Sequence, residues 1–398
     1  MQSVAEARAR ILAALTATAP ETVPLAEAAG RILARPVEAR LTQPPAAVSA
    51  MDGYAVRGAD ARLDARLRVI GAAPAGHPFA GAVGAGEAVR IFTGAFIPNG
   101  ADAILLQEDA TAEGGDVLVR EAVTPGRWVR PAGLDFSAGE ELLAPGRRLT
   151  ARDIGLAAAA NHPWLAVHRR PRIGILATGD EIALPGDPLP PGGIVSSNAH
   201  ALAALVRALG AEPVVLPIAP DDADAIATLA QGARGCDMLV TTGGASVGEH
   251  DLVQKALGPK GFALDFWQIA MRPGKPLIWG RLGETPMLGL PGNPVSALVC
   301  AVVFLLPAIA VMAGLPAAPT PSAAAIAGAD LAANDQREDY LRCVLSEDGA
   351  VATPFGRQDS SMLKTLARAD GLLIRAPHAP ALAAGAPVRV IRLAALGI

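Results

Sequence analysis

Between about residues 172 and 316, short apolar segments alternate with longer amphipathic ones. The apolar segments have the length of β-strands and cover residues 173–177, 214–217, 238–241, 277–279 and 287–290. Such alternation predicts β-α-β units, in which right-handed crossovers build a parallel sheet. Because ligands bind at the carboxyl ends of parallel strands, the same pattern predicts where the chemistry of the protein lies.

Glycine and polar residues are concentrated just after four of these strands. The four groups are Thr178, Gly179, Asp180 and Glu181; Asp221 and Asp222; Gly243, Gly244, Ser246, Gly248 and Asp251; and Pro291, Gly292, Asn293, Pro294 and Ser296. Backbone N–H groups in glycine turns bind phosphate, and carboxylates bind divalent cations such as Mg²⁺. The spacing predicts one site for a polyanionic ligand held partly by a metal ion, although an ordinary tight turn would explain each group alone.

Two further features favour an anionic ligand. Arg272 and Lys275 lie in one segment rich in proline and glycine, which would hold two positive charges in a rigid turn. A solvated hairpin is the plain alternative for this segment. Asn293 is a favourable N-cap and Pro294 a favourable first helical residue, so a helix is predicted to start there with the positive end of its dipole toward the ligand.

The third glycine loop matches two well-known motifs only in part. Gly243 and Gly248 have the spacing of a phosphate-binding P-loop, but Glu249 and His250 stand where that motif needs Lys and Ser or Thr. The same loop contains the G-x-S-x-G pattern of a hydrolase nucleophile. A triad would then need a downstream histidine, and only His250, which is too close in sequence, and the distant His378 follow. Both interpretations are disfavoured.

The remaining sequence predicts separate structural units. Ser3 and Glu6 form a capping-box pattern at the start of an amphipathic helix that ends before Pro20. Residues 46–139 contain short β-rich runs broken by glycine and proline, and similar runs follow the proline-rich junction at residues 316–321. At 398 residues, the chain is long enough for two or three domains, or for more if some are small.

Composition excludes several classes of protein. The formal net charge is −4, so the chain lacks the basic surplus that a general nucleic-acid binder uses to neutralise phosphates. With 51% hydrophobic and 18% charged residues, it can bury large cores and is not a disordered chain. Its three cysteines form no Cys-x-x-Cys pair, so we expect them to be reduced and structural.

One segment could be taken for a membrane span. Residues 297–315 contain no charge, but Pro307 interrupts them and no Lys or Arg flanks them within a turn. We therefore expect a helix buried in the α/β unit. The first residues include Glu6, Arg8 and Arg10, unlike the uncharged core of a signal peptide, so a cytoplasmic location is predicted.

Taken together, the motifs resemble those of the molybdopterin molybdenumtransferases, the family of MoeA and the gephyrin E-domain. The α/β segment contributes residues 178–181, the glycine loop at 243–248 with Asp251, residues 272–276 and residues 291–296. The first two alone would also fit the related molybdopterin adenylyltransferases of the MogA type and the CinA-like proteins. Residues 49–57 and 90–95 resemble motifs of the family's own second domain, which those stand-alone adenylyltransferases lack. The resemblance covers essentially the whole chain.

The resemblance implies a multidomain α/β plus β fold in an L-shaped homodimer. The expected units are an extended N-terminal dimerisation domain (residues 1–45 and 140–170), a β-rich second domain (46–139), a MogA-like three-layer α/β domain (171–318) and a C-terminal β-barrel (319–398). The active site would lie in a cleft between the α/β domain of one subunit and the second domain of its partner.

The resemblance also implies the reaction. The family inserts molybdate into adenylated molybdopterin, which releases AMP and forms the molybdenum cofactor, and the reaction requires Mg²⁺. The expected partners are a molybdopterin adenylyltransferase and downstream cofactor-maturation proteins or apo-molybdoenzymes, with no nucleic acid and no membrane. A non-catalytic molybdopterin-binding scaffold and a paralogue that handles tungstate are the alternatives.

Site residues follow from the matching motifs. The resemblance implies catalytic roles for Asp52, Thr93, Asp135, Glu181 and Asp251, with Asp52, Glu181 and Asp251 as metal ligands. It implies substrate binding by the strand-end residues named above, by Arg272 and Lys275, and by Ser360 or Ser361 of the C-terminal module. Spacing does not distinguish Asp221 from Asp222, or Ser360 from Ser361. Two positions depart from the family pattern, since Leu134 replaces a more usual polar residue before Asp135, and Arg272 stands where lysine also occurs.

Overall fold

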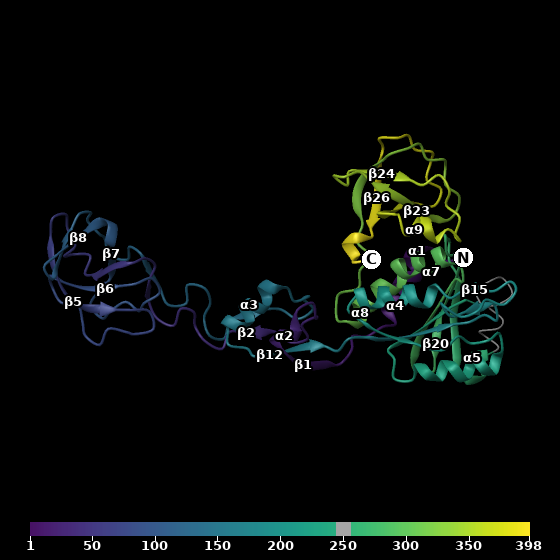
Figure 1. Ribbon diagram of the computed structural model, residues 1–398, viewed down its shortest axis with the longest axis horizontal. Coiled ribbons are helices and arrows are strands. Elements are labelled where there is room, and N and C mark those ends of the chain that lie inside the picture. The colour runs from purple at the N-terminus through teal and green to yellow at the C-terminus, as the bar shows by residue number, and fades with distance from the viewer. Residues whose placement is uncertain (244–255) are drawn as a thin grey trace.

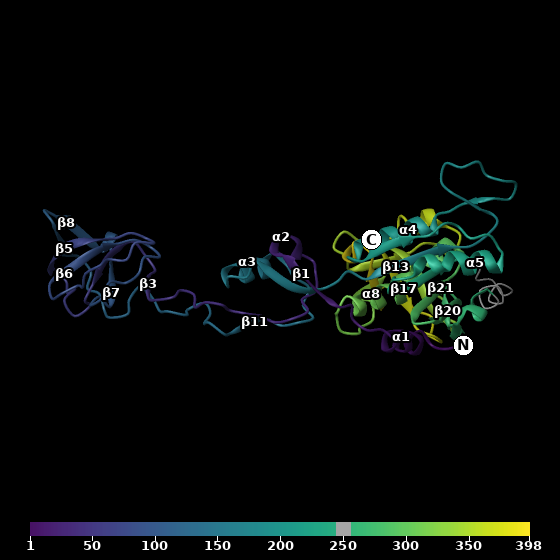
Figure 2. The same ribbon diagram turned by 90° about the horizontal axis from the view of Figure 1, so that it is seen from below.

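The computed structural model describes residues 1–243 and 256–398 and has an L-shaped outline in Figure 1, and Figure 2 shows its long arm from below. A β-rich domain forms the far end of the long arm, and a small domain with α2 and α3 connects it to an α/β domain. The C-terminal domain stands on the α/β domain and forms the short arm. The chain runs out along the long arm and returns. The connecting domain therefore contains residues from before 45 and from after 140.

The α/β domain is built on a six-stranded sheet with the order β16-β13-β17-β21-β20-β18. Its strands are β13 (Arg172–Ala177), β16 (Glu212–Val215), β17 (Met238–Thr242), β18 (Phe262–Gln268), β20 (Pro276–Leu282) and β21 (Thr285–Leu290). The predicted parallel sheet is confirmed for β16, β13, β17 and β21. β20 instead runs antiparallel to both of its neighbours. Gly283 and Glu284 join it to β21 in a two-residue hairpin turn, and residues 269–275 return the chain from β18.

Helices cover both faces of this sheet. One face carries α1 (Val4–Ala13), α4 (Asn198–Ala208), α7 (Pro294–Cys300) and α8 (Leu306–Met312), and the other carries α5 (Ala223–Ala230). A π-helical turn, Ala301–Leu305, joins α7 to α8. The resemblance places residues 1–45 in the extended N-terminal domain. The structure differs for α1, because its buried side chains Val4 and Ile11 belong to the core of the α/β domain.

The apolar segment that contains Pro307 is part of this core, as expected. The helix from Pro294 to Met312 is long and apolar enough to cross a membrane, and 83% of its most apolar window is buried inside the molecule. Burial inside a folded domain accounts for its composition without a bilayer.

The connecting domain has a small core of its own. It pairs β1 (Pro20–Pro24) with β12 (Trp164–His168) and β2 (Val37–Glu38) with β11 (Glu141–Leu143), beside α2 (Leu25–Ala28) and α3 (Ala151–Ala159). Thr150 and Asp153 form a capping box at the start of α3. Oδ2 of Asp153 accepts hydrogen bonds from the backbone N–H of Thr150 at 2.8 Å and from its hydroxyl at 2.7 Å.

The β-rich domain contains a six-stranded sheet with the order β7-β4-β6-β5-β9-β8. Its strands are β4 (Gly53–Val56), β5 (Arg66–Ala73), β6 (Glu87–Ile91), β7 (Ala103–Leu106), β8 (Ala110–Glu113) and β9 (Asp116–Val119), with the short pair β3 (Val48–Ser49) and β10 (Val129–Arg130) beside them. Apolar residues fill cores on both faces of this sheet.

The C-terminal domain is a closed five-stranded barrel, as predicted. Its strands are β22 (Ala323–Ala327), β23 (Glu338–Leu345), β24 (Val351–Pro354), β25 (Gly371–Arg375) and β26 (Pro387–Arg392), and the pairing of β23 with β25 closes it. The barrel also takes up a strand from the α/β domain, because β19 (Met271–Arg272) pairs in parallel with β23. The short helix α9 (Leu363–Leu366) lies in the connection between β24 and β25.

Candidate functional site

A pocket of about 500 Å³ opens at the carboxyl ends of β13, β17 and β21. The predicted site residues that line it are Glu181, Gly243, Pro291, Gly292, Asn293, Pro294 and Ser296. Ser196, Ser197, Asn198, Thr242 and Pro276 are among the residues that complete its wall. The structure therefore brings the first, third and fourth predicted strand ends together around one cavity.

Two glycines allow the first and third loops to approach closely. Gly179 and Gly243 both have positive φ, at 144° and 94°. A Cβ atom on Gly243 would lie 2.2 Å from the carbonyl oxygen of Thr178, and one on Gly179 would lie 2.6 Å from a carboxylate oxygen of Glu181. Only glycine fits at these two positions, so the loops pack backbone to backbone and Glu181 lies against the first turn.

The second strand end separates the two neighbouring aspartates. Asp222 is the N-cap of α5, and its Oδ1 accepts a hydrogen bond from the N–H of Ala225 at 2.8 Å. The N–H of Asp221 instead donates to Oδ1 of Asp180 at 3.0 Å, which ties the second loop to the first. Asp222 thus has a structural role, and Asp221 is the aspartate joined to the strand-end loops.

The fourth loop meets the C-terminal barrel. Asn293 precedes α7 as predicted, but its side chain does not cap the helix. Its Nδ2 donates to Oγ of Ser360 at 3.0 Å, and the carbonyl oxygen of Ser360 accepts from the N–H of Val295 at 3.2 Å. The Oγ of Ser361 donates to Asp359 instead. Ser360 is therefore the serine that reaches the pocket wall.

Asn198 is a site residue that sequence reasoning did not identify. Ser197 is the N-cap of α4, and Asn198 is the first residue of the helix. Its Nδ2 donates to Oγ1 of Thr242 at 2.8 Å and to the carbonyl oxygen of Gly292 at 2.7 Å. One side chain thus joins three segments of the pocket wall. The polar run at residues 196–198 was the available signal.

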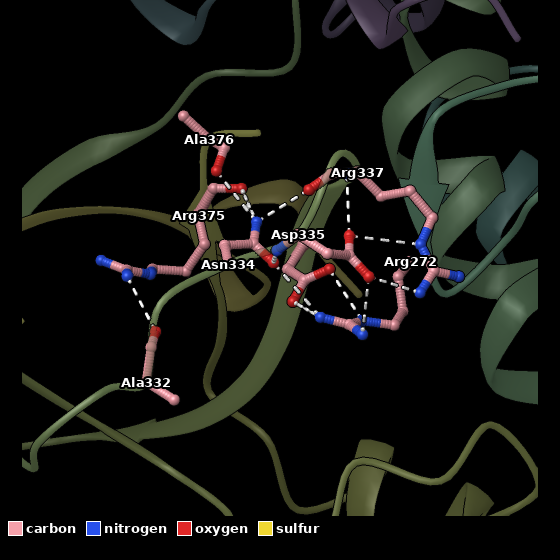
Figure 3. Close-up of polar contacts among 8 residues, drawn as sticks. Arg272, Ala332, Asn334, Asp335, Arg337, Arg375 and Ala376 are labelled. Atoms are coloured by element: carbon pink, nitrogen blue, oxygen red, sulfur yellow. Dashed lines mark hydrogen bonds and ion pairs between the residues drawn. The ribbon is translucent and has the colours of Figure 1, made fainter. Parts of the chain in front are cut away.

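Arg272 and Lys275 are separated by the structure. The guanidinium group of Arg272 turns toward the C-terminal barrel (Figure 3), and it forms an ion pair there with Asp339. Asp339 raises the pKa of the Arg272 guanidinium through this hydrogen-bonded pair. Arg272 does not belong to the pocket lining, whereas Pro276 does and the neighbouring Lys275 is exposed.

Asp52 and Thr93 form a tight pair in the β-rich domain. The backbone N–H and the hydroxyl of Thr93 both donate to Oδ1 of Asp52 at 2.7 Å. These two bonds lower the pKa of Asp52, the backbone bond most, and the charge of Arg90 acts in the same direction. Ser49 shapes the preceding turn, because its Oγ donates to the carbonyl oxygen of Met51 at 2.6 Å.

This pair lies at the far end of the long arm from the α/β pocket (Figure 1). One chain therefore does not bring Asp52 or Thr93 to Glu181. Asp135 lies in the returning segment, exposed, with its N–H donating to the carbonyl oxygen of Gln43 at 3.0 Å. The predicted residues Gly244, Ser246, Gly248 and Asp251 lie outside the described residues.

The geometry suits an anionic ligand with several polar groups. The pocket combines closely packed glycine turns, the start of α7 and a nearby lysine with the carboxylate of Glu181. Among residues 1–243 and 256–398, no three His, Cys, Asp or Glu side chains gather around a point that could hold a metal ion. Mg²⁺ commonly takes only one or two carboxylates and completes its shell with water and substrate phosphates, so Glu181 beside a bound phosphate is compatible with it.

Comparison with known proteins finds relatives that match this chain over nearly its whole length. Three family profiles match in order: "MoeA N-terminal region (domain I and II)" at residues 2–161, "Probable molybdopterin binding domain" at 174–311 and "MoeA C-terminal region (domain IV)" at 324–393. Molybdopterin molybdenumtransferase 2 of Mycobacterium tuberculosis is 37% identical over 98% of this chain and 99% of its own. The molybdopterin molybdenumtransferase of Nostoc sp. is 39% identical over 81% of this chain and 76% of its own. A crystal structure of the MoeA protein from Pyrococcus horikoshii superposes with a TM-score of 0.87 at 30% identity, covering 98% of both chains.

Proposed function

The chain belongs to the MoeA family of molybdopterin molybdenumtransferases, and from that premise we propose that it inserts molybdate into adenylated molybdopterin, releasing AMP and the molybdenum cofactor. Membership makes the protein a transferase of molybdenum cofactor biosynthesis. The single observation that carries the finer proposal is the pocket of about 500 Å³ at the carboxyl ends of the parallel strands, where Glu181 faces glycine turns and a helix start.

The proposed chemistry is the opening of a phosphoanhydride next to an incoming oxyanion. Such a reaction needs neutralised charge and an oriented leaving group more than it needs covalent catalysis. We assign the phosphates of the substrate to the glycine turns at Gly179 and Gly243, with Lys275 as the nearby positive charge. Asn198 and Asn293 would act indirectly. Their hydrogen bonds to Gly292 and Ser360 hold the pocket wall in place, and that wall would orient the polar groups of the ligand.

Glu181 is the carboxylate that we assign to magnesium in this pocket, together with water and phosphate oxygens. When bound, the ion would withdraw negative charge from the anhydride and stabilise the departing phosphate. Asp251 was expected to be a second ligand and lies outside the described residues.

We also propose that the working unit is a homodimer. Asp52 and Thr93 lie in the β-rich domain, at the opposite end of the molecule from the pocket. They can therefore act in the reaction only if a second copy places its β-rich domain over the α/β domain. The division into four domains, the cytoplasmic location and the expected partners, namely an adenylyltransferase upstream and apo-molybdoenzymes or maturation proteins downstream, belong to the same proposal.

The test is a reconstituted reaction with purified protein, adenylated molybdopterin, Mg²⁺ and molybdate. We expect AMP release that requires both molybdate and Mg²⁺, and its loss in Glu181→Ala while the protein remains folded by circular dichroism. Tight pterin binding without AMP release would contradict the proposal and favour a scaffold. A requirement for tungstate in place of molybdate would contradict the assigned metal oxyanion.

A further inference from the structure

The two turns beside the pocket are both attached to the C-terminal barrel. Pro276 and Asn293 line the pocket, and each belongs to a proline- and glycine-containing turn of the α/β domain. The first turn continues from β19, which pairs with β23 of the barrel, and the second contacts Ser360 of the barrel. The barrel therefore determines where part of the pocket wall lies.

Arg272 makes the most extensive of these contacts. Its Nε donates to Oδ1 of Asp339 at 2.9 Å, and one Nη donates to Oδ2 of the same carboxylate, which is the bidentate geometry of a strong ion pair. Asp335 and Asn334 accept further bonds from the same guanidinium at 3.4 and 3.2 Å (Figure 3). Asp339 is only 5% exposed, whereas the side chain of Arg272 is 47% exposed, so solvent reaches this ion pair from the arginine side only.

The acceptors are themselves held in place by the barrel. Asp335 accepts from the backbone N–H of Arg337 at 2.9 Å and from its guanidinium at 2.7 Å, and these bonds lower the pKa of Asp335 to about 2. Asn334 donates to the carbonyl oxygens of Arg337, Arg375 and Ala376 (Figure 3). The barrel thus presents a rigid, ionised receptor for one guanidinium group.

The turn beyond Arg272 has little freedom on its other side. A Cβ atom on Gly274 would lie 2.3 Å from Sγ of Cys300 in α7, so the turn packs directly onto that helix. The N–H of Ile269 donates to the carbonyl oxygen of Lys275 at 3.1 Å, which closes the turn. With Arg272 anchored at one end, the position of Lys275 is set within a small range.

We propose that Arg272 is a positioning residue and not a substrate ligand: its ion pair with Asp339 fixes the turn that carries Lys275. Four of the five N–H groups of its guanidinium bond to the barrel, and a planar guanidinium suits the bidentate contact as an ammonium group would not. Lys275 is then the cation of this turn that meets the anionic ligand. This inference rests on the proposed function, since it assigns how that same site is organised.

The test is a double-mutant cycle with Arg272→Met, Asp339→Asn and the pair, measured by AMP release and by fluorescence titration with molybdopterin. We expect each single variant to lower kcat by about tenfold or more with a smaller change in pterin affinity, because a displaced turn misplaces Lys275. The double variant should lose no more than Arg272→Met alone. Arg272→Lys should not restore activity, because lysine cannot make the bidentate contact. Asp348→Asn, at an exposed turn of the same barrel, is the matched control and should retain wild-type activity.

Opposite outcomes would overturn the inference. If Arg272 bound substrate directly, Asp339→Asn would remain active and Arg272→Lys would retain most of the activity. Hydrogen exchange of the amides at residues 269–277 provides a readout without substrate. We expect faster exchange in Arg272→Lys and Asp335→Asn, and unchanged exchange would refute the positioning role even if the variant of the buried Asp339 did not fold. A wild-type protein that released no AMP would contradict the proposed function while leaving the exchange result to decide the role of Arg272.

Discussion

Thr93 donates two hydrogen bonds of 2.7 Å to a single oxygen of Asp52, one from its backbone and one from its hydroxyl. The two bonds stabilise the charged form of the carboxylate and lower its pKa. They also fix the direction in which the second oxygen of Asp52 points. The pair therefore behaves as a rigid, ionised acceptor on the surface of the β-rich domain.

Replacement of Thr93 by Val tests whether this ionised state matters. The hydroxyl bond is lost, while the larger contribution of the backbone N–H remains, so the pKa of Asp52 should rise part of the way to its ordinary value. A group with a lowered pKa loses its charge only at more acidic pH, so the acidic limb of the pH–kcat profile should move to higher pH in Thr93→Val. Thr93→Ser keeps a hydroxyl and should retain the wild-type profile. An unchanged acidic limb in Thr93→Val would show that Asp52 ionisation does not limit turnover.

The Ser360 contact predicts a difference between adjacent serines. Ser360→Ala removes the acceptor of the Asn293 side chain, which should loosen the fourth loop and lower kcat/KM several-fold. Ser361→Ala removes only a local bond to Asp359 and should change turnover little. Steady-state AMP release by the two variants checks this. Equal losses, or a greater loss in Ser361→Ala, would contradict the assignment of Ser360 to the pocket wall.

The parallel part of the fold was predictable because its signals are local. Strands β13, β17 and β21 are short apolar runs followed at once by glycine turns, so both the strands and their shared edge could be expected. The antiparallel direction of β20 was missed, although the short connection between the predicted strands at 277–279 and 287–290 leaves no room for the crossover that a parallel pair requires. The ion pair of Arg272 with Asp339 joins positions 67 apart in sequence, and no local pattern announces such a partner. The role of Asn198 was equally hidden, because its bonds to Thr242 and Gly292 depend on the packing of three segments.

Asp222 offers a test that separates stability from catalysis. Asp222→Ala removes the N-cap of α5 and should lower the free energy of unfolding by about 1 kcal/mol, whereas Asp222→Asn keeps a capping oxygen and should cost less. Urea denaturation followed by circular dichroism measures both. Turnover of the folded Asp222→Ala protein should remain near that of the wild type. A large loss of kcat in both variants would instead assign the reaction to Asp222.

Asp153 makes the stability of the connecting domain dependent on pH. Burial tends to raise its pKa, but hydrogen bonds from the N–H and hydroxyl of Thr150 and from Arg147 outweigh burial and lower it. The folded pKa then lies below the unfolded value of about 4, so the stabilisation is complete above pH 4 and is lost as the pH falls through the folded pKa. Asp153→Ala should lower stability by about 1–2 kcal/mol at pH 7, with a smaller difference near pH 3. Urea midpoints at the two pH values test this, and an equal difference at both would contradict it.

The proposed homodimer can be tested by complementation between inactive variants. Asp52→Ala and Glu181→Ala change two domains, the β-rich domain and the α/β domain, that lie at opposite ends of one protomer. If each active site combines the β-rich domain of one copy with the α/β pocket of the other, a mixed dimer contains one site in which both residues are intact and one in which both are lost. Random exchange of equal amounts should then restore about a quarter of wild-type AMP release. If each site were contained within a single chain, every site in the mixture would still carry one of the two substitutions, and unfolding and refolding the variants together would restore no activity.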